Sequence, residues 1–320
     1  MMGGPEMAPH LHSLRRFLYR RQFYRLLPRI MVDGLRAGDR RGRVFVAMIG
    51  GIGDLVNLFP TLDRLGENAR VDLGTGPGAC AALARRHPRL HRVYTPFVYK
   101  PIRRAHRRVI ERALSPWYER VILLDEADSA WRTRSTHMSR VYAERCGCPP
   151  PPRGAIHLNA EDRAAADRFL RDRGVKDFVF VVQLIRRDRA FRSWPLGHYQ
   201  RLLTVMRDRC RLPVLVHTVG SDETATPEGV ITIDGGDILT VAAMVERARL
   251  YIGPDTGLTH IAAALGVPTV SIHLGYPTEI CRALGDNVRV VAQARPYDDP
   301  ARTTPDQVLA AVDAMLGART

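Results

Sequence analysis

Apolar residues follow two patterns that alternate along the chain. Short uninterrupted apolar runs predict buried strands, and apolar residues at positions i, i+3, i+4 and i+7 predict helices. The predicted strands cover residues 43–49, 70–73, 91–94, 121–124, 177–183, 213–217, 230–233 and 250–252, and a further strand starts at Val270. The predicted helices cover residues 55–65, 79–86, 127–144, 160–173, 196–209, 238–247, 258–265 and 305–316. Strands that alternate with helices are typical of βαβ units built on a parallel sheet.

A proline-rich stretch divides this pattern into two halves. Four prolines at 149–152 follow Cys148, and the alternation of helices and strands then starts again. We therefore predict an α/β protein with two Rossmann-like, doubly wound domains over 43–152 and 153–300, preceded by a basic N-terminal extension over 1–42. We expect the last helix, within 301–320, to pack back across the domains. Such folds bind ligands at the carboxyl ends of their strands, so we expect a cleft in which the two domains face each other.

The composition is typical of a globular protein. The chain has 320 residues, of which 45% are hydrophobic and 25% charged, and this length suffices for two domains. No stretch reaches 18 uncharged apolar residues, and the N-terminus lacks the apolar core of a secretory signal, so we expect a cytoplasmic protein. The 5 cysteines form no metal-ligand spacing with histidines, which favours reduced, mostly buried thiols. The close pair Cys146 and Cys148 fits a linker feature, with metal or redox chemistry as the alternative.

The net charge of +15 indicates an anionic partner, and two basic clusters carry much of it. The first lies among apolar residues near the N-terminus and comprises Arg15, Arg16, Arg20, Arg21, Arg25 and Arg29. It is typical of a basic helix on an anionic membrane, and the alternative is a solvated helix or one packed on the protein. The second follows the strand predicted at 91–94 and is expected to receive a phosphorylated acceptor; it comprises Lys100, Arg103, Arg104, Arg107, Arg108 and Arg112.

The segment 251–275 predicts a strand, a tight turn, a helix and a second strand around one Asp-Thr-Gly sequence. The start of a helix has free backbone N–H groups and the positive end of the helix dipole, so Thr256 and Gly257 would face an anion such as a phosphate. The alternative is that Asp255 or Thr256 only caps the helix. His260 falls on the face opposite the apolar stripe, which favours a binding site.

A second glycine-rich turn, 50–54, follows the first predicted strand and ends in Asp54. One alternative is a dinucleotide-binding turn with Asp72 as the ribose contact. However, Val56 stands where that motif needs a small residue, and Asp54 would place a carboxylate where a pyrophosphate must bind. A carboxylate at this position is better suited to accepting a proton or to capping the helix.

Three segments, in this order and at these separations, resemble one family of enzymes: GGIGDLVNLFPTLDRL, LIRRDRAFRSWPLGHYQRLL and GPDTGLTHIAAALGVPTVSIHLG. They are similar to glycosyltransferase family 9, the bacterial heptosyltransferases of lipopolysaccharide synthesis, from Arg43 to the C-terminus. The resemblance implies a GT-B fold, with an ADP-sugar held mostly by the second domain and a glycan or glycolipid acceptor at the first. It also implies metal-free transfer with inversion. The basic N-terminal segment, which is longer than the family requires, would associate a cytoplasmic enzyme with the inner face of the cytoplasmic membrane or only pack on the protein.

The resemblance further implies roles for individual residues. Asp54 matches the acidic residue proposed as general base, and Arg192 falls where the family usually has a phosphate-binding lysine. The residues expected to bind the donor are Gly53, Arg192, Glu223, Asp255, Thr256, Gly257 and His260, with Glu223 near the position of a ribose contact. The acceptor is expected at Lys100, Arg103, Arg104, Arg107 and Arg108. Arg186 and Arg187 depart from the family pattern, which often has small hydroxyl residues there.

Other classes of protein share part of this profile. An NAD-dependent oxidoreductase would have the same two-domain α/β shape. A nucleic-acid-binding protein would explain the positive charge, but the chain lacks a recognisable nucleic-acid recognition motif, so we expect no nucleic-acid partner. The last alternative is a transferase fold that binds a nucleotide sugar or an anionic polymer without catalysis.

Overall fold

The computed structural model describes residues 9–97, 104–125, 135–209 and 212–317, and the chain divides into two compact units. Unit 1 comprises Met1–Gly51 and Leu62–Ser129, and unit 2 comprises Ile52–Thr61 and Ala130–Thr320. Helix α2 (Ile52–Leu62) therefore belongs to unit 2 over almost its full length. Within the described residues, no helix is long and apolar enough to cross a membrane.

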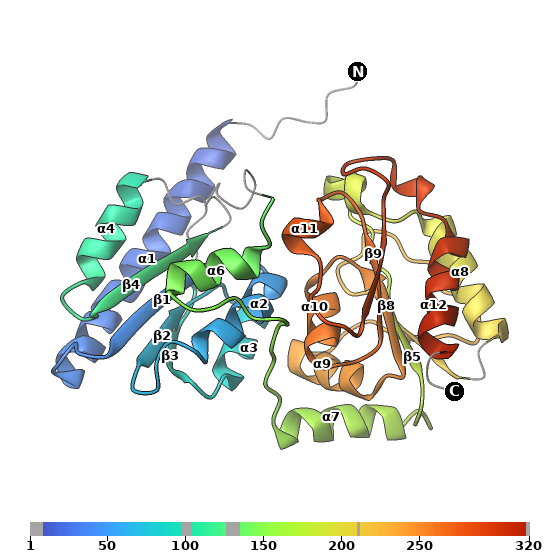
Figure 1. Ribbon diagram of the computed structural model, residues 1–320, viewed down its shortest axis with the longest axis horizontal. Helices are drawn as coiled ribbons and strands as arrows, with labels where there is room; N and C mark the ends of the chain where they lie inside the picture. The colour runs from blue at the N-terminus through green and yellow to red at the C-terminus, as the bar shows by residue number, and fades with distance from the viewer. Residues whose placement is uncertain (1–8, 98–103, 126–134, 210–211, 318–320) are drawn as a thin grey trace. The chain divides into compact units, whose positions relative to one another are not determined.

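Unit 1 is built on a four-stranded parallel sheet in the order β3-β2-β1-β4 (Figure 1). Its strands are β1 (Arg43–Ile49), β2 (Arg70–Gly74), β3 (Leu90–Tyr94) and β4 (Arg120–Asp125). Every residue of β1 is buried, as expected of a central strand made almost entirely of apolar residues. Val44 of β1 lies opposite Val71 on one side and Arg120 on the other.

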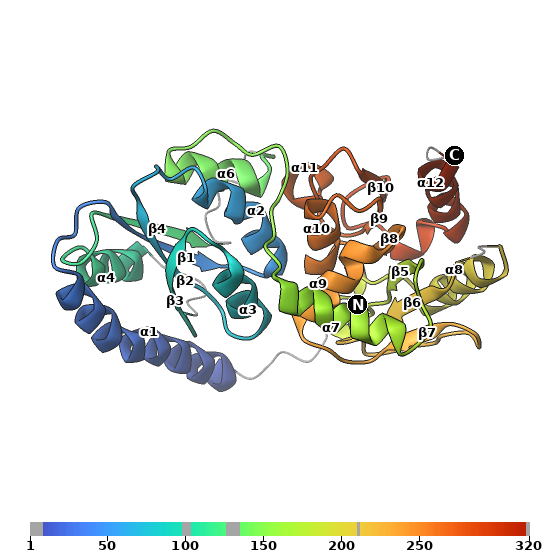
Figure 2. The same ribbon diagram turned by 90° about the horizontal axis from the view of Figure 1, so that it is seen from below.

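The helices among the described residues of unit 1 are α1 (Pro9–Ala37), α3 (Ala79–Arg86) and α4 (Arg104–Leu114). Helices α1 and α4 share one face of the sheet, as Figure 2 shows. From α1, Phe23, Leu26 and Ile30 are buried in a core cluster with Phe45 of β1, and Ile110 of α4 joins the same cluster. The apolar residues of the N-terminal extension thus supply one side of a hydrophobic core.

Unit 2 contains a six-stranded parallel sheet in the order β10-β9-β8-β5-β6-β7. Its strands are β5 (Val179–Val182), β6 (Val214–His217), β7 (Ile231–Ile233), β8 (Leu250–Pro254), β9 (Thr269–His273) and β10 (Val288–Ala292). The longer helices are α6 (Met138–Cys146), α7 (Ala160–Arg171), α8 (Leu196–Arg209), α9 (Ile238–Arg247), α10 (Gly257–Ala264) and α12 (Pro305–Gly317). Shorter helical turns are η1 (Arg187–Arg192), α11 (Thr278–Cys281) and η2 (Pro300–Arg302).

Helices cover both faces of this sheet, which explains why its central strands are uniformly apolar. Helices α8 and α12 pack on one face, where Leu202 and Val308 meet Val181 and Ile252 in a buried cluster. Helices α9 and α10 lie on the opposite side of the strands (Figure 1). The last helix, α12, packs against α8, β9 and β10 of its own unit.

The predicted helix over 127–144 is not continuous. Residues 135–137 form a turn and extended backbone, α6 begins at Met138, and 126–134 lie outside the described residues. His137 accepts a hydrogen bond from the backbone N–H of Ser139 and so acts as the N-cap. The sequence pattern did not indicate that a helix begins here, because histidine is an uncommon N-cap residue. The pattern also missed α4 and the half-buried edge strand β10, where Arg289 interrupts the apolar run.

Candidate functional site

The turn between β8 and α10 positions Asp255, Thr256 and Gly257 at the carboxyl edge of the unit 2 sheet. Thr256 is the N-cap residue in extended conformation, but its side chain makes no capping hydrogen bond. Its hydroxyl oxygen is buried and has no hydrogen-bond partner among the described residues. The prediction that Thr256 serves only as a cap is therefore not supported, and the helix start keeps the N–H groups that suit an anion.

Asp255 is buried, with 8% of its surface exposed, and two basic side chains approach its carboxylate. Arg192 donates through Nη2 to Oδ2 at 2.9 Å and to the backbone carbonyl of Asp255 at 2.6 Å. His260 Nε2 lies 3.6 Å from Oδ1. Burial by itself would raise the pKa of Asp255, but His260, His273 and Arg192 together bring that pKa below its usual range. The carboxylate is thus held in its charged form.

His260 links this carboxylate to α2. The amide of Asn57 donates to Nδ1 of His260 at 3.3 Å, so in the neutral ring Nε2 carries the proton and directs it toward Asp255. The sequence placed His260 on the polar face of α10, yet it is buried, because the start of α2 covers that face. A Cβ on Gly53 would lie 2.7 Å from the His260 ring.

Asp54 occupies the first turn of α2 and is buried, with 9% of its surface exposed. Tyr142 of α6 donates its hydroxyl proton to Oδ1 of Asp54 at 2.7 Å. The two helix starts touch directly, since a Cβ on Gly257 would lie 2.5 Å from Cβ of Ile52. The two glycine turns that the sequence singled out therefore meet within unit 2, and each contributes one buried carboxylate.

Glu223 stands apart from this group, in the segment after β6. Its carboxylate accepts from Nη2 of Arg187 at 3.2 Å, and Arg187 also donates its backbone N–H to Asp222 at 2.7 Å. Arg187, which departs from the family pattern, is thus the ion-pair partner of the residue expected at the ribose. The carboxylate is half exposed and accessible to a ligand.

The basic residues expected at the acceptor belong to unit 1. Lys100 and Arg103 lie outside the described residues, and Arg104 is the first residue of α4. Arg107 donates to the backbone carbonyl of Leu123 at 3.2 Å, whereas Arg108 is exposed. Arg108 is therefore the member of this cluster whose exposure is established.

Two groups of side chains within the described residues have the residue types of metal ligands. In unit 2, atoms of Asp255, His273 and Cys281 lie within 4.8 Å of one another. A metal needs the thiolate, but burial raises the pKa of the Cys281 thiol, and the adjacent Arg192 guanidinium opposes a cation. These residues fit a metal poorly.

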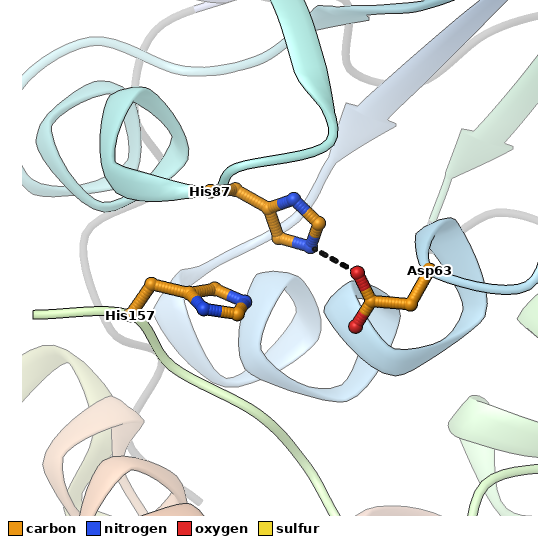
Figure 3. A group of neighbouring side chains, drawn as sticks. All are labelled: Asp63, His87 and His157. Carbon is orange, nitrogen blue, oxygen red and sulfur yellow. Dashed lines mark ion pairs between the residues drawn. The ribbon is translucent and has the colours of Figure 1, made fainter. Parts of the chain in front are cut away.

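In unit 1, Asp63 Oδ1 lies 3.6 Å from Nε2 of the buried His87, as Figure 3 shows. Two ligands from one aspartate and one histidine are fewer than a structural metal site needs. The third side chain drawn in Figure 3, His157, belongs to unit 2.

Sequence reasoning did not find Tyr142 or Asn57. Each acts through a partner far along the chain, 88 residues away for the bond to Asp54 and 203 residues away for the bond to His260. Tyr142 lies in none of the three family segments. Asn57 lies in the first of them, but nothing in that segment shows that its amide contacts His260.

A family model described as glycosyltransferase family 9 (heptosyltransferase) matches residues 129–308, more than half of the chain. No curated protein sequence matches the chain. Among solved structures, the chain is similar to Escherichia coli ADP-heptose lipopolysaccharide heptosyltransferase II, with a TM-score of 0.66 and 16% identity over 87% of this chain and 99% of that one.

Two further structures share the architecture. Escherichia coli heptosyltransferase WaaC with ADP matches with a TM-score of 0.58 and 16% identity, over 85% of this chain and 99% of that one. The dodecameric iron-containing heptosyltransferase TibC of enterotoxigenic Escherichia coli, in complex with ADP-D-β-D-heptose, matches with a TM-score of 0.60 and 13% identity, over 88% and 78%. The fold is therefore GT-B, with two Rossmann-like domains.

Proposed function

The chain belongs to glycosyltransferase family 9, the heptosyltransferases, and we propose that it transfers a heptose or related sugar from an ADP-sugar to a lipopolysaccharide-type or other glycan acceptor. The observation that carries this proposal is the contact between the starts of α2 and α10, which joins Asp54 to the Asp255-Thr256-Gly257 turn. One carboxylate is available for the acceptor, and the turn is available for the donor.

Asp54 is the proposed general base. In an inverting transfer, the acceptor hydroxyl oxygen attacks the anomeric carbon, the bond to the diphosphate oxygen breaks, and the hydroxyl proton passes to a carboxylate. The hydrogen bond from Tyr142 to Oδ1 fixes the orientation of Asp54. It also favours the ionised carboxylate that must accept the proton.

The donor diphosphate is proposed to bind at the start of α10, against the backbone N–H groups next to Thr256 and Gly257. Arg192 supplies positive charge at the same turn, and its Nε and Nη1 groups make no hydrogen bond with the described residues. Charge on the leaving diphosphate increases in the transition state, so these groups replace the metal ion that other transferases use. We accordingly propose metal-independent transfer.

Three further donor contacts are proposed. Asp255 holds a sugar hydroxyl, because its carboxylate remains charged beside Arg192 and His260. Gly53 allows α2 to approach the donor turn closely, since any side chain there would collide with His260. Glu223 binds the nucleotide ribose from the segment after β6, two strands away from β8 in the sheet.

The acceptor is proposed to bind unit 1 through the basic cluster around α4, where Lys100, Arg103, Arg104, Arg107 and Arg108 would contact its phosphates. Arginine binds phosphate oxygens through two parallel hydrogen bonds, and the exposed Arg108 is suited to this contact. This proposal accounts for part of the net charge of +15.

We also propose that α1 rests on the anionic inner face of the cytoplasmic membrane. Its inner side is buried in the core of unit 1, while its outer side exposes apolar residues at helical spacing: Tyr24, Met31, Val32 and Leu35. Leu35 is the most exposed of these four, at 67%. Arg25 and Arg36 flank this stripe and are also exposed. Apolar residues bordered by arginine are typical of helices that lie in the interface of anionic bilayers.

A panel of nucleotide sugars tests the function directly. We expect donor hydrolysis or transfer, followed by mass spectrometry, with ADP-heptose rather than UDP- or GDP-sugars, and unchanged turnover in excess EDTA. We expect Asp54→Asn to reduce turnover by several orders of magnitude while retaining ADP affinity. Full transfer activity of Asp54→Asn would remove the general-base assignment, and loss of activity in EDTA would remove the metal-free mechanism.

A further inference from the structure

Three aromatic rings form a partly exposed cluster beside Arg192. Phe191, Tyr276 and Tyr297 have pairwise ring-centroid distances of 5.7 to 5.8 Å. Phe191 is 36% exposed and Tyr297 is 59% exposed. Aromatic rings of this size normally contribute to stability by being buried, so an exposed cluster of three indicates a surface that contacts a ligand.

The cluster is held in place by specific polar contacts. The backbone N–H of Tyr297 donates to the carbonyl of Gly275 at 2.7 Å, and the side chain of Gln293 accepts from the N–H of Gly275 at 2.7 Å. Gln293 also donates to the carbonyl of Asp298 at 2.6 Å. These bonds join the loop after β9 to the loop after β10.

The backbone of Tyr297 is strained. Its φ is 62°, in the left-handed region that a tyrosine rarely adopts and that costs on the order of 1 kcal/mol or more. Gly275, with φ of 85°, lies under the Phe191 ring, which would be 2.9 Å from an added Cβ. Strain that persists at an exposed aromatic residue is characteristic of binding sites.

The cluster is connected to the proposed donor site. The Arg192 guanidinium lies 4.9 Å from the centroid of the Tyr276 ring and also binds Asp255. Tyr276 further packs against a small core that includes Val141 of α6, the helix that carries Tyr142. Tyr276 therefore lies beside the arginine that holds Asp255.

The order of the strands indicates which part of the donor reaches this surface. Glu223 follows β6, the diphosphate turn follows β8, and Tyr276 follows β9, in the sheet order β9-β8-β5-β6. Neighbouring strands are about 4.8 Å apart, so β6 and β9 are separated by roughly 14 Å. If the ribose lies at β6 and the diphosphate at β8, the sugar extends toward β9.

We propose that Phe191 and Tyr297, whose ring planes are inclined by 37°, form a stacking surface that contacts the C–H face of the donor sugar, with the Tyr276 ring nearly perpendicular beside them. This inference rests on the proposed function, because it takes the start of α10 as the diphosphate site. Sugar rings present C–H groups on one face, which the negative face of an aromatic ring attracts. The polar rim of Asp255 and Arg192 then fixes the hydroxyl groups.

The test compares the affinities of ADP and ADP-heptose by calorimetry, without acceptor. Tyr297→Asn removes one ring, and asparagine tolerates the left-handed backbone, so the thermal midpoint is expected to be unchanged or higher. We expect this variant to bind ADP with wild-type affinity and ADP-heptose 5- to 20-fold more weakly, and Tyr297→Phe to restore binding. Phe169→Ala is the matched control, because Phe169 of α7 is a partly buried aromatic residue of the same unit whose ring contacts Arg173.

The stacking surface is overturned if Tyr297→Asn binds both ADP and ADP-heptose as the wild type does, or if its affinity for both falls by the same factor. Either result leaves the proposed function intact. A wild-type protein that binds no nucleotide sugar overturns the proposed function, and the stacking surface with it.

Discussion

Tyr142 donates its hydroxyl proton to Oδ1 of Asp54 over 2.7 Å, between two helices that start 86 residues apart in the chain (52 and 138). A hydrogen bond to a charged group contributes about 1.5 to 3 kcal/mol. We expect Tyr142→Phe, which removes only the hydroxyl, to reduce kcat by roughly 10- to 100-fold with little change in donor KM.

The same variant has a distinctive pH dependence. Loss of the hydrogen bond favours the protonated carboxyl, so the acidic limb of the kcat profile should shift to higher pH. Steady-state rates between pH 5 and 9 measure this shift. A variant with a lower kcat but an unshifted limb would indicate that Tyr142 supports packing and not the base.

The contact between Gly257 and Ile52 leaves no room for a side chain. Gly257→Ala would place Cβ 2.5 Å from Cβ of Ile52 and push α2 away from the donor turn. We expect destabilisation by about 1 to 3 kcal/mol and at least a 10-fold loss of kcat, because displacement of Asp54 by even 1 Å is costly.

Gly197→Ala is the control for this prediction. Gly197 lies within α8, and an added Cβ there would meet no atom within 4 Å. Alanine is favoured over glycine in helices, so we expect this variant to be as stable as the wild type or slightly more so, and fully active. If Gly257→Ala had the same kcat as the wild type and Gly197→Ala, catalysis by Asp54 would not depend on the close contact between α2 and the donor turn.

Arg192 balances the charge of Asp255 and is proposed to bind the diphosphate. Arg192→Ala should weaken ADP binding at least 10-fold and also lower stability, since it removes the guanidinium from a buried carboxylate and leaves the histidines His260 and His273 to offset its charge. Arg192→Lys restores the charge but not the two-point geometry, so we expect intermediate affinity. Calorimetry with ADP and urea unfolding measure the two effects. If ADP affinity is equal in all three proteins, Arg192 has a structural role alone.

Most of the fold could be predicted because its central strands, such as β5 and β8, are largely apolar and fully buried, and its helices are periodic. The predicted helices 79–86, 196–209 and 238–247 coincide with α3, α8 and α9. Prediction failed where the determining contact was not local. Strand β10 is only half buried, and the start of α6 depends on a histidine cap.

The candidate site likewise contains residues that could be identified from the sequence and residues that could not. Asp54 and Asp255 were identifiable because each follows a strand and begins a helix, and family membership now favours a glycosyltransferase over an NAD-dependent oxidoreductase. Tyr142, the partner of Asp54, and Asn57, the partner of His260, were not identifiable, since only the folded chain brings each pair together. The basic cluster of α4 and the roles of individual donor contacts stay predictions.

Membrane association of α1 can be measured by sedimentation with vesicles. We expect the full chain to bind vesicles containing phosphatidylglycerol and to bind pure phosphatidylcholine weakly, with binding reduced by salt. Leu35→Glu, on the exposed side of α1, should reduce binding several-fold without unfolding the protein. Val219→Glu changes an exposed apolar residue of unit 2 and should bind as the wild type. Equal binding by both variants would exclude α1 as the contact surface.

His137 makes the stability of unit 2 dependent on pH through the start of α6. Nδ1 accepts from the N–H of Ser139 at 3.2 Å, and Nε2 donates to the carbonyl of Arg282 at 2.9 Å, so the ring must be neutral. Burial lowers the pKa of His137 to about 4. A pKa below the unfolded value of about 6.5 means that this contribution to the free energy of unfolding is complete above pH 6.5 and is lost as the pH falls toward 4.

Protonation would disrupt the cap of the helix that carries Tyr142, and so would disturb Asp54. His137→Asn keeps a capping oxygen that does not titrate. We expect the wild type to lose up to roughly 3 kcal/mol more than this variant between pH 6.5 and pH 4, by urea unfolding. His217 and His273, whose pKa values burial also lowers, are present in both proteins, so the difference isolates His137. Parallel pH dependence in the two proteins would show that α6 does not depend on a neutral His137.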